Sequence, residues 1–564
     1  MLAMAGRLVH DRPKEPLTVR TVRSHRTAGA PQNDHGILRQ SHPEGRTRPT
    51  AAWDSRECLA KARIDPAFIG SYRFHLGGLV GRSWEGVSLM ISRRRAIKLG
   101  AGILGAGCLG VWGFSRSRRR VERPNVVFIL TDDHRWNAMS CMGHPLARTP
   151  NIDRLAAEGA LFENSFTTMS LCCPSRASVL TGQYPHSHGV LKNGGDQFNP
   201  EWKTFPRMLQ EAGYRTALIG KWHLGPAVPQ PGFDYWVSFT GQGKYVNPEL
   251  NDNGTSVKTS GYITDLLTDY SVRWMAQQTQ PLCLFLSHKA CHSKVTPAAR
   301  HRTLFKGAQV PEPPNWRDTL QSKPVWQRAV ASGLWRQTPP GTYDGPVPDA
   351  IVPREWEPGP AALDYYRVLC AVDEGLGRLM DQLDSMNALD STTIILAGDN
   401  GTLRGAHGLR NKRCMYEESI RVPLVIRHPQ VGRRGIRPPE FALNIDMAPT
   451  ILDMAGVDIP PEMQGRSLMP VLAGRAGDWR RAFLYESFWQ PYCKVPTTEG
   501  VRTEHHSLAT YPGLDDLDEL YDLRTDPHQL HNLAADPAHQ ETRTRLLDWL
   551  AHLKKETGFP AQSA

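Results

Sequence analysis

A cysteine pair followed by an arginine is the part of this sequence whose residue types and spacing most directly suggest chemistry. The stretch reads Cys172-Cys173-Pro174-Ser175-Arg176 and continues into residues 177–182. Its pattern predicts a helix that begins at the cysteines, where free backbone N–H groups and the helix dipole lower a thiol pKa and attract anions. One helical turn places Cys172 and Arg176 on the same face. The alternative interpretation is a pair of ordinary buried thiols, and we assign Cys173 to packing alone.

Acidic side chains and an amide follow two apolar runs of strand length. Asp132 and Asp133 come soon after one run, and Asp399 and Asn400 come soon after the other. Because the carboxyl ends of parallel strands meet at one edge of a sheet, we expect these side chains to lie together. An all-oxygen set is the preference of a hard cation such as Ca²⁺ or Mg²⁺. Either pair alone is also a common turn or helix cap.

Lysine and histidine side chains could supply the charge and the proton transfer that an anionic substrate needs. In an expected strand over residues 214–223, alternation places Lys221 and His223 on one face, one as fixed charge and one as proton carrier. An exposed edge strand would explain the same pattern. Lys412 lies among arginines, which taken alone is typical of a solvated face.

The elements that must position these residues alternate between strand and helix. Continuous apolar runs, as expected for strands buried on both faces, occupy residues 125–130, 281–286, 392–397 and 423–426. Helical patterns occupy residues 151–158, 205–212 and 362–386. This alternation predicts an α/β fold with a mixed, mostly parallel central sheet flanked by helices. The tail from residue 479 holds short strand patterns and a closing helix over 541–555, which predicts a smaller α+β subdomain.

The basic charge of the chain is confined to its N-terminal region. The 564 residues carry a net charge of +11, but residues 1–120 contain 22 Lys and Arg against 8 Asp and Glu, and the remainder contains 45 against 48. The expected folded body is therefore mildly acidic and lacks the basic, aromatic strip of a nucleic-acid binder. The 10 cysteines show no Cys-x-x-Cys spacing, which argues against a thiolate zinc site.

The N-terminal region contains an expected export signal. Ser92-Arg93-Arg94 with Lys98 precedes an apolar run over 99–114, a pattern typical of a twin-arginine signal and short for a membrane span. Cleavage, lipid attachment at Cys108 and an uncleaved anchor stay open as alternatives. Either way, we expect an exported protein of the periplasm or cell envelope.

Four parts of the chain are expected. Residues 1–89 are disordered or belong to a start assigned too far upstream, residues 90–120 are the export signal, residues 121–465 are the catalytic domain and residues 466–564 are the C-terminal α+β subdomain.

The cysteine stretch resembles the signature of the type I sulfatases, the formylglycine-dependent family of the alkaline phosphatase-like superfamily. That signature is Cys-x-Pro-Ser-Arg followed by Thr-Gly, which here ends at Gly182. Further blocks that look like those of the family are residues 149–156, 220–223, 398–401 and 519–527. They occur in the family's order over roughly residues 122–550. The resemblance implies an alkaline phosphatase-like fold and a hydrolase of sulfate esters.

The resemblance also implies a modified residue and a metal. A maturation enzyme would oxidise Cys172 to Cα-formylglycine, whose hydrate would be the nucleophile. One Ca²⁺ would be held by Asp132, Asp133, Asp399, Asn400 and the side chain derived from Cys172.

The remaining family roles fall on basic side chains. Arg176 would support the formylglycine hydrate, and Lys221 and Lys412 would hold the sulfate oxygens. His223 would help to break down the sulfated intermediate. His292 would protonate the leaving alcohol and is preferred to His288, because the family's histidine usually sits just before the chain turns away.

The substrate implied by the resemblance is a sulfated carbohydrate. The residues around the signature look most like those of carbohydrate sulfatases that include glucosamine-6-sulfatases, and His407 is expected to line the pocket. Loops over 226–262 and 306–360 are expected to select the sugar. The alternatives are a phosphonate monoester or phosphodiester hydrolase of the same superfamily, and an inactive protein that binds sulfated glycans. Expected partners are therefore the sulfated carbohydrate, the maturation enzyme and the twin-arginine export machinery.

Overall fold

A computed structural model describes residues 123–560, apart from residues 196, 227–230, 280, 336–342, 354, 356–357, 360 and 491–493. All of these residues belong to one compact unit of the chain. The expected export signal over 90–120, with Cys108, and the region 1–89 lie outside the described residues. Within the described part, no helix is both long enough and apolar enough to cross a membrane.

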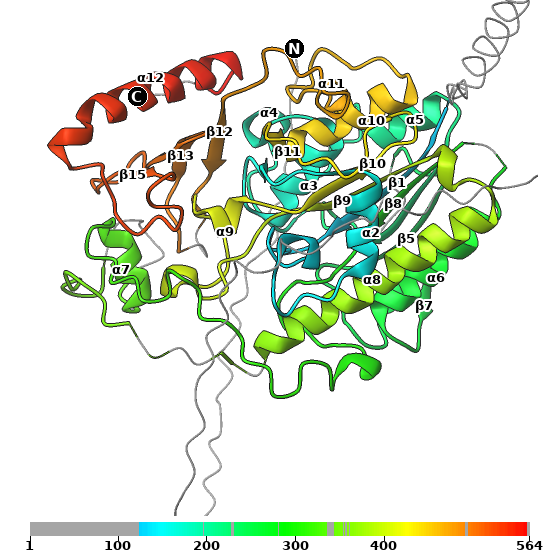
Figure 1. The fold of residues 1–564 in the computed structure, drawn as a ribbon, viewed down its shortest axis with the longest axis horizontal. Helices are drawn as coiled ribbons and strands as arrows, with labels where there is room; N and C mark the ends of the chain where they lie inside the picture. The colour runs from blue at the N-terminus through cyan, green and yellow to red at the C-terminus, as the bar shows by residue number, and fades with distance from the viewer. Residues whose placement is uncertain are drawn as a thin grey trace, which may run out of the picture. The chain divides into compact units, whose positions relative to one another are not determined.

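A nine-stranded mixed sheet forms the centre of this unit (Figure 1), in the order β2-β10-β9-β1-β8-β4-β5-β6-β7. The five central parallel strands are β9 (Thr392–Gly398), β1 (Asn125–Thr131), β8 (Leu282–Ser287), β4 (Arg215–Lys221) and β5 (Tyr235–Phe239). The strands antiparallel to a neighbour are β10 (Leu424–Arg427), β2 (Ala160–Leu161), β6 (Glu249–Asp252) and β7 (Thr255–Lys258). The prediction of a mixed, mostly parallel sheet is confirmed.

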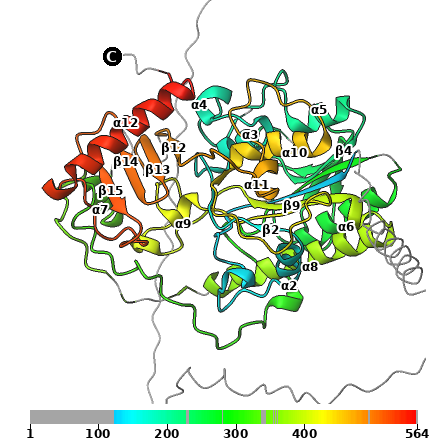
Figure 2. The same ribbon diagram turned by 45° about the horizontal axis from the view of Figure 1, so that its top comes forward.

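Strand β1 shows why the sheet is buried on both faces. Val127 and Ile129 point into one hydrophobic core, and Val126 and Phe128 point into the other. The first core is covered by α2 (Pro150–Glu158), α6 (Ile263–Ala276) and α8 (Ala361–Ser385). The second is covered by α3 (Cys172–Thr181), α5 (Phe205–Glu211), α10 (Met447–Ala455) and α11 (Met469–Leu472). Figure 2 shows these two helix layers on opposite sides of the sheet.

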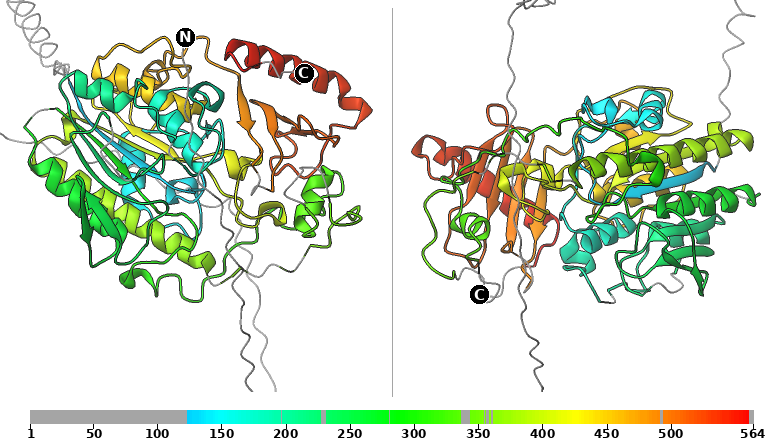
Figure 3. Two further views of the ribbon diagram at one scale, coloured as in Figure 1. Left: turned by 180° about the vertical axis from the view of Figure 1, so that it is seen from behind. Right: turned by 90° about the horizontal axis from the view of Figure 1, so that it is seen from below.

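A separate antiparallel sheet forms the C-terminal part of the fold (Figure 3). Its strands are β12 (Ala482–Ser487), β13 (Thr498–Thr503), β14 (His506–Thr510) and β15 (Glu519–Asp522). Helix α12 (Gln540–Glu556) packs on it through Leu546, Leu550 and Leu553, which share one helical face. The α+β character of this region is confirmed, while the boundary at residues 465–466 stays a prediction.

Shorter elements connect these layers. They are α4 (Pro185–His188), α7 (Val325–Ala331), α9 (Glu417–Ile420), the paired strands β3 (Ser165–Phe166) and β11 (Ala442–Leu443), and the 3₁₀ helices η1 (Ser140–Met142), η2 (Ala299–His301), η3 (Leu389–Ser391), η4 (Ala406–Gly408), η5 (Asn444–Asp446) and η6 (Pro537–His539). The region 306–360, expected as surface loops, contains α7 and the buried side chains of Asn315 and Lys323.

Candidate active site

Neighbouring parallel strands end at the same level of the central sheet. The pairing places Thr131 of β1 opposite Gly398 of β9, and Leu130 opposite Ser287 of β8. Ser287 is in turn opposite Gly220 of β4. The residues that follow these strands therefore meet at one edge, as expected for a parallel sheet.

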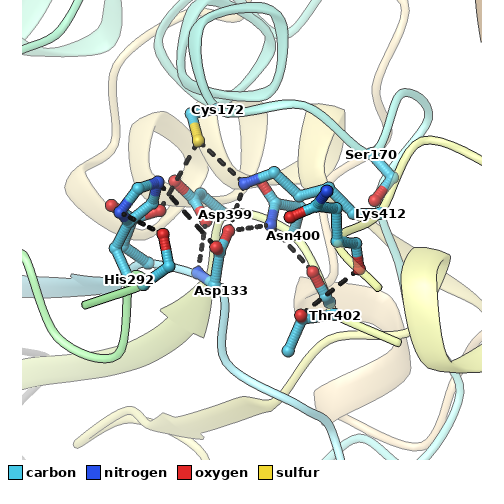
Figure 4. Close-up of polar contacts among 12 residues, drawn as sticks. Asp133, Ser170, Cys172, His292, Asp399, Asn400, Thr402 and Lys412 are labelled. Carbon is cyan, nitrogen blue, oxygen red and sulfur yellow. Dashed lines mark hydrogen bonds and ion pairs between the residues drawn. The ribbon is translucent and has the colours of Figure 1, made fainter. Parts of the chain in front are cut away.

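Cys172 begins α3 and lies fully buried beside these strand ends (Figure 4). Its Sγ is 2.9 Å from Lys412 Nζ and 3.6 Å from Asp132 Oδ1. Burial raises the pKa of the Cys172 thiol to about 12. The prediction that this thiol has a lowered pKa is therefore wrong, because the lost solvation of a thiolate outweighs the lowering effect of the Lys412 charge. As a thiol, Cys172 would be a weak nucleophile at neutral pH.

Three carboxylates and an amide gather next to Cys172. Ligand oxygens of Asp132, Asp133 and Asp399 lie within 4.8 Å of one another. Asn400 Nδ2 donates to Asp133 Oδ1 at 2.7 Å, while its buried Oδ1 has no hydrogen-bond partner among the described residues. Burial, and then repulsion from Asp132, raise the pKa of Asp399 to about 7. A cation would relieve this repulsion and engage the free amide oxygen, so the donor set fits a hard metal ion such as Ca²⁺.

Two buried ammonium groups complete the charge of the site. Lys221 Nζ forms an ion pair with Asp132, and Lys412 Nζ forms one with Asp133. Although burial alone would lower the pKa of Lys412, the charge of Asp133 outweighs it and raises that pKa. Lys412 is therefore a fixed positive charge, suited to anionic oxygens near Cys172.

Arg176 lies one turn along α3 and braces the helix against three strand ends. Its Nε and Nη2 are 3.1 and 2.9 Å from Asp399 Oδ2. Its Nη1 donates to Ser287 Oγ at 2.6 Å and to the carbonyl of Lys221 at 3.0 Å. Arg176 thus fixes the start of α3, with Cys172, relative to β9, β8 and β4.

The segment around β4 differs from the sequence-based expectation. Strand β4 ends at Lys221, lies between β8 and β5 rather than at an edge, and His223 has a φ of 65° outside the strand. Simple alternation therefore does not place Lys221 and His223 together. Instead, Gln242 links the two side chains. Its Oε1 accepts from Lys221 Nζ at 2.7 Å, and its Nε2 lies 3.2 Å from His223 Nε2.

Cys173 contacts the same histidine. Its Sγ donates to the carbonyl of His223 at 2.7 Å and lies 3.5 Å from His223 Nδ1. These are the contacts of a buried thiol packed against His223, and the assignment of Cys173 to packing alone stays a prediction. Burial, and then the charge of Lys221, lower the pKa of His223 to about 2, so its imidazole is neutral.

The two histidines after β8 occupy different surroundings. His292 Nε2 lies 3.9 Å from Asp133 Oδ2, and His292 lines a cavity together with Cys172. His288 is 1% exposed, its Nδ1 has no hydrogen-bond partner among the described residues, and it is not among the residues that line the cavity. The geometry thus agrees with the preference for His292, whose backbone carbonyl also accepts from Tyr245 OH at 2.9 Å.

The cavity above Cys172 has a volume of about 1230 Å³. Asp133, Lys412 and His407 also line it, as do many residues of the region 306–360. None of the described residues of 226–262 lines it, although Gln242 from that region bonds to Lys221. Of the described residues in the two expected specificity loops, only those of 306–360 therefore line this cavity.

Sequence reasoning missed three uncharged residues. Gln242 and Ser287 hold basic side chains of the site, and Asn193 Oδ1 accepts from the backbone N–H of Cys173 at 3.0 Å. Neutral polar residues carry no local motif, and no signal in the sequence distinguishes these three from ordinary loop residues.

Comparison with known proteins gives two family matches. A family described as "Sulfatase" matches residues 124–457. A second, described as "N-sulphoglucosamine sulphohydrolase, C-terminal", matches residues 405–556. Together they span the nine-stranded sheet and the C-terminal sheet with α12.

Among curated proteins, the N-acetylglucosamine-6-O-sulfatase of Bacteroides thetaiotaomicron is 33% identical over 492 residues, covering 78% of this chain and 88% of that protein. The human N-acetylglucosamine-6-sulfatase is 32% identical over 411 residues, covering 67% and 69%. One similar solved structure, in complex with its substrate D-glucosamine-2-N,6-O-disulfate, has a TM-score of 0.69 and 32% identity, with 78% of this chain and 100% of that chain covered. This chain therefore belongs to the sulfatase family and is an enzyme that hydrolyses sulfate esters.

Proposed function

We propose that this sulfatase removes the 6-O-sulfate from glucosamine residues of a glycosaminoglycan, using a formylglycine made from Cys172 and a bound Ca²⁺. One observation carries the proposal: Cys172 lies buried at the base of a large cavity, in contact with Lys412 and next to an all-oxygen cluster. The 6-sulfatase names of the relatives that cover most of this chain support the choice of sugar and position.

Formylglycine and calcium would supply what the unmodified chain lacks. The hydrate of formylglycine would supply one hydroxyl for attack on sulfur and a second whose deprotonation would expel the sulfate and restore the aldehyde. Calcium held by Asp132, Asp133, Asp399 and Asn400 would offset negative charge on the sulfate oxygens. The buried thiol, with its raised pKa, cannot do this work, which agrees with its being a precursor.

The chain's own residues would orient and neutralise the ester. Lys412 and Lys221 would hold the non-bridging oxygens as fixed charges, in a site where burial strengthens each interaction. Arg176 would keep α3 in place, and His292 would donate a proton to the leaving alcohol oxygen. Neutral His223, fixed by Gln242, would accept a proton near the modified side chain.

A panel of sulfated monosaccharides and disaccharides tests the proposed position and sugar. We expect turnover of N-acetylglucosamine-6-O-sulfate to exceed turnover of the 3-O-sulfated isomer and of galactose-6-O-sulfate. A preference for another position or sugar would reject the substrate assignment and leave the sulfatase chemistry intact.

Phosphonate ester hydrolysis is the alternative reaction within the superfamily. The solved phosphonate monoester hydrolase of Agrobacterium radiobacter shares the fold at 23% identity and a TM-score of 0.63, with 77% of this chain and 96% of that chain covered. Comparing 4-nitrophenyl sulfate with a 4-nitrophenyl phosphonate monoester would reveal a phosphonate preference if one exists. An inactive glycan-binding protein would have lost some of the side chains proposed to bind the metal ion, whereas this sequence retains all of them.

We also infer that the protein is exported through the twin-arginine machinery, after a maturation enzyme has acted on Cys172. The Ser92-Arg93-Arg94 pattern supports this route, and two relatives carry the name extracellular sulfatase. Replacing Arg93 and Arg94 together by lysine should retain the protein in the cytoplasm in a fractionation experiment. Normal export of the double variant would contradict the route.

A further inference from the structure

The loop that carries Lys412 is closed on itself by its backbone. Leu403 N donates to the carbonyl of Asn411 at 2.7 Å, and η4 forms the tip of the 403–411 loop between them. Lys412 follows directly after Asn411. The position of its ammonium group beside Cys172 therefore depends on where the 403–411 loop is held.

His407 pins the tip of the 403–411 loop to a distant segment. Its backbone N–H donates to the carbonyl of Asn315 at 3.0 Å. Its Nδ1 lies 2.8 Å from Asp318 Oδ2, and its Nε2 lies 2.9 Å from Asn315 Nδ2. The imidazole also stacks on Tyr416, with 3.9 Å between ring centroids and 23° between ring planes. These contacts join the tip to the wall of the cavity.

The partners of His407 determine which nitrogen carries its proton. Hydrogen bonding from His407 and the charge of Lys323 overcome burial and lower the pKa of Asp318, so this carboxylate only accepts. Nδ1 must therefore donate to Asp318. Asn315 Nδ2 also donates to Glu418 Oε1 at 2.9 Å, which fixes the amide orientation, so Nε2 of His407 accepts. Both nitrogens are used within the protein, and neither is left for a substrate.

The backbone of His407 gives a second indication that its side chain is needed. Its φ and ψ are 55° and 26°, in the left-handed region, which costs energy for a residue with a Cβ. Glycine would adopt this conformation without that cost. The histidine contacts therefore stabilise a loop geometry that the side chain itself disfavours.

We propose that His407, held by Asp318 and Asn315, is a positioning residue that fixes Lys412 against the sulfate-binding site. The proposal rests on the proposed role of Lys412 in holding sulfate oxygens. His407 would act only through Lys412, since it has no free nitrogen in the cavity.

The test uses variants of His407 that separate the effect of its side-chain contacts from the effect of its left-handed backbone conformation. His407→Gly relieves the backbone but removes every side-chain contact, and should lower kcat/KM by about 10- to 100-fold. His407→Asn tolerates the left-handed conformation and keeps a donor for Asp318, so it should retain activity within about fivefold. His428→Ala is the matched control, because His428 is also buried and bonds to Thr393 at the start of β9, at the other end of that strand from Asp399.

Binding of inorganic sulfate, measured by thermal shift, tells positioning apart from general destabilisation. His407→Gly should weaken sulfate binding by the same factor as kcat/KM, but should cause no further loss when Lys412→Met is already present. A folded His407→Gly variant with wild-type kcat/KM and sulfate affinity, or an equal loss in both backgrounds, would overturn the proposal. Should His407→Gly fail to fold, Asn315→Ala is judged by the same criteria.

The two proposals fail in different ways. If Lys412→Met leaves sulfate binding and turnover unchanged, the proposed function of Lys412 is wrong. If Lys412→Met is impaired while the His407 variants are not, only the positioning role is wrong.

Discussion

Lys412 Nζ lies 2.9 Å from Cys172 Sγ, although 240 positions separate the two residues in the sequence. The contact places a permanent positive charge beside Sγ of Cys172. In the proposed formylglycine, an aldehyde oxygen takes the place of this sulfur. A sulfate ester attacked there would bring its anionic oxygens to a donor already in place, which is how preorganised charge accelerates such reactions.

Replacing each of the two adjacent cysteines by alanine in turn tests which of them is needed for turnover. Cys172→Ala should lower turnover of 4-nitrophenyl sulfate by at least about 10³-fold, because no formylglycine can form. Cys173→Ala loses only its contacts with His223 and should keep about a tenth of the activity or more. Intact mass should show wild type about 18 Da lighter than its sequence mass, and Cys172→Ala without that deficit. The reverse pattern of activity would mean that the signature has been misaligned by one residue.

Calcium should stabilise the folded protein through its acidic cluster. Above its dissociation constant, each tenfold increase in Ca²⁺ concentration should add about 1.4 kcal/mol to the free energy of unfolding. Removal of Ca²⁺ by EGTA should abolish both this stabilisation and the activity. Asp399→Asn should abolish the calcium-dependent rise in melting temperature. Asp390→Asn, which changes an exposed carboxylate before the start of β9, should leave it intact. A calcium response that survives in Asp399→Asn would place the ion elsewhere.

The two histidines after β8 should differ in their dependence on the leaving group. His292→Ala should lower kcat/KM about 10²- to 10⁴-fold for sugar sulfates, whose alkoxide needs a proton, and far less for 4-nitrophenyl sulfate. His288→Ala should lower the melting temperature without changing the ratio between these two substrates, since His288 is buried away from the cavity. A changed ratio in His288→Ala alone would reassign the acid.

His186 should make the stability of the C-terminal region depend on pH. His186 Nδ1 lies 2.7 Å from Glu486 Oε2, and Nε2 lies 3.0 Å from the carbonyl of Thr557 after α12. Burial lowers the pKa of His186, but hydrogen bonding to Glu486 outweighs it and the pKa is raised. Burial also raises the pKa of Glu486.

The sign of the effect follows from these directions. A histidine with a raised pKa stabilises the folded state fully below its unfolded pKa of about 6.5, and the contribution is lost as pH rises through the folded value. Glu486 also has a raised pKa in the folded state, so its contribution to stability is likewise lost as pH rises above the usual pKa range of a glutamate. The melting temperature of wild type should therefore exceed that of His186→Gln most below pH 6.5, and the gap should narrow toward pH 8.5. A difference in melting temperature that widens as pH rises would show that the pKa of His186 is not raised in the folded protein.

The sheet was predictable where its strands are buried on both faces. Such strands read as continuous apolar runs, which is why β1, β8, β9 and β10 are visible in the sequence. Strands β6 and β7 are partly exposed and short, so they leave no comparable run. The reversed direction of β10 depends on pairing between distant segments, which periodicity does not report.

The site was predictable as a set of residue types and less so as an environment. Asp132 and Asp399 could be brought together because both follow parallel strands. The raised pKa of Cys172 could not be foreseen, since it arises from layers packed around the start of α3. The contacts of His223 likewise depend on Gln242, which lies 19 positions further along the chain and outside any motif.

The complete burial of α3 has a consequence for how the active protein is made. All 10 residues of this helix, from Cys172 to Thr181, are shielded from solvent once the domain has formed. An enzyme that recognises Cys172 together with Pro174 and Arg176 would have to bind them as an open peptide. Modification and folding would then compete for the same newly made chain, and a molecule that folds first would keep its thiol for good. The active fraction would therefore be decided by relative rates during synthesis.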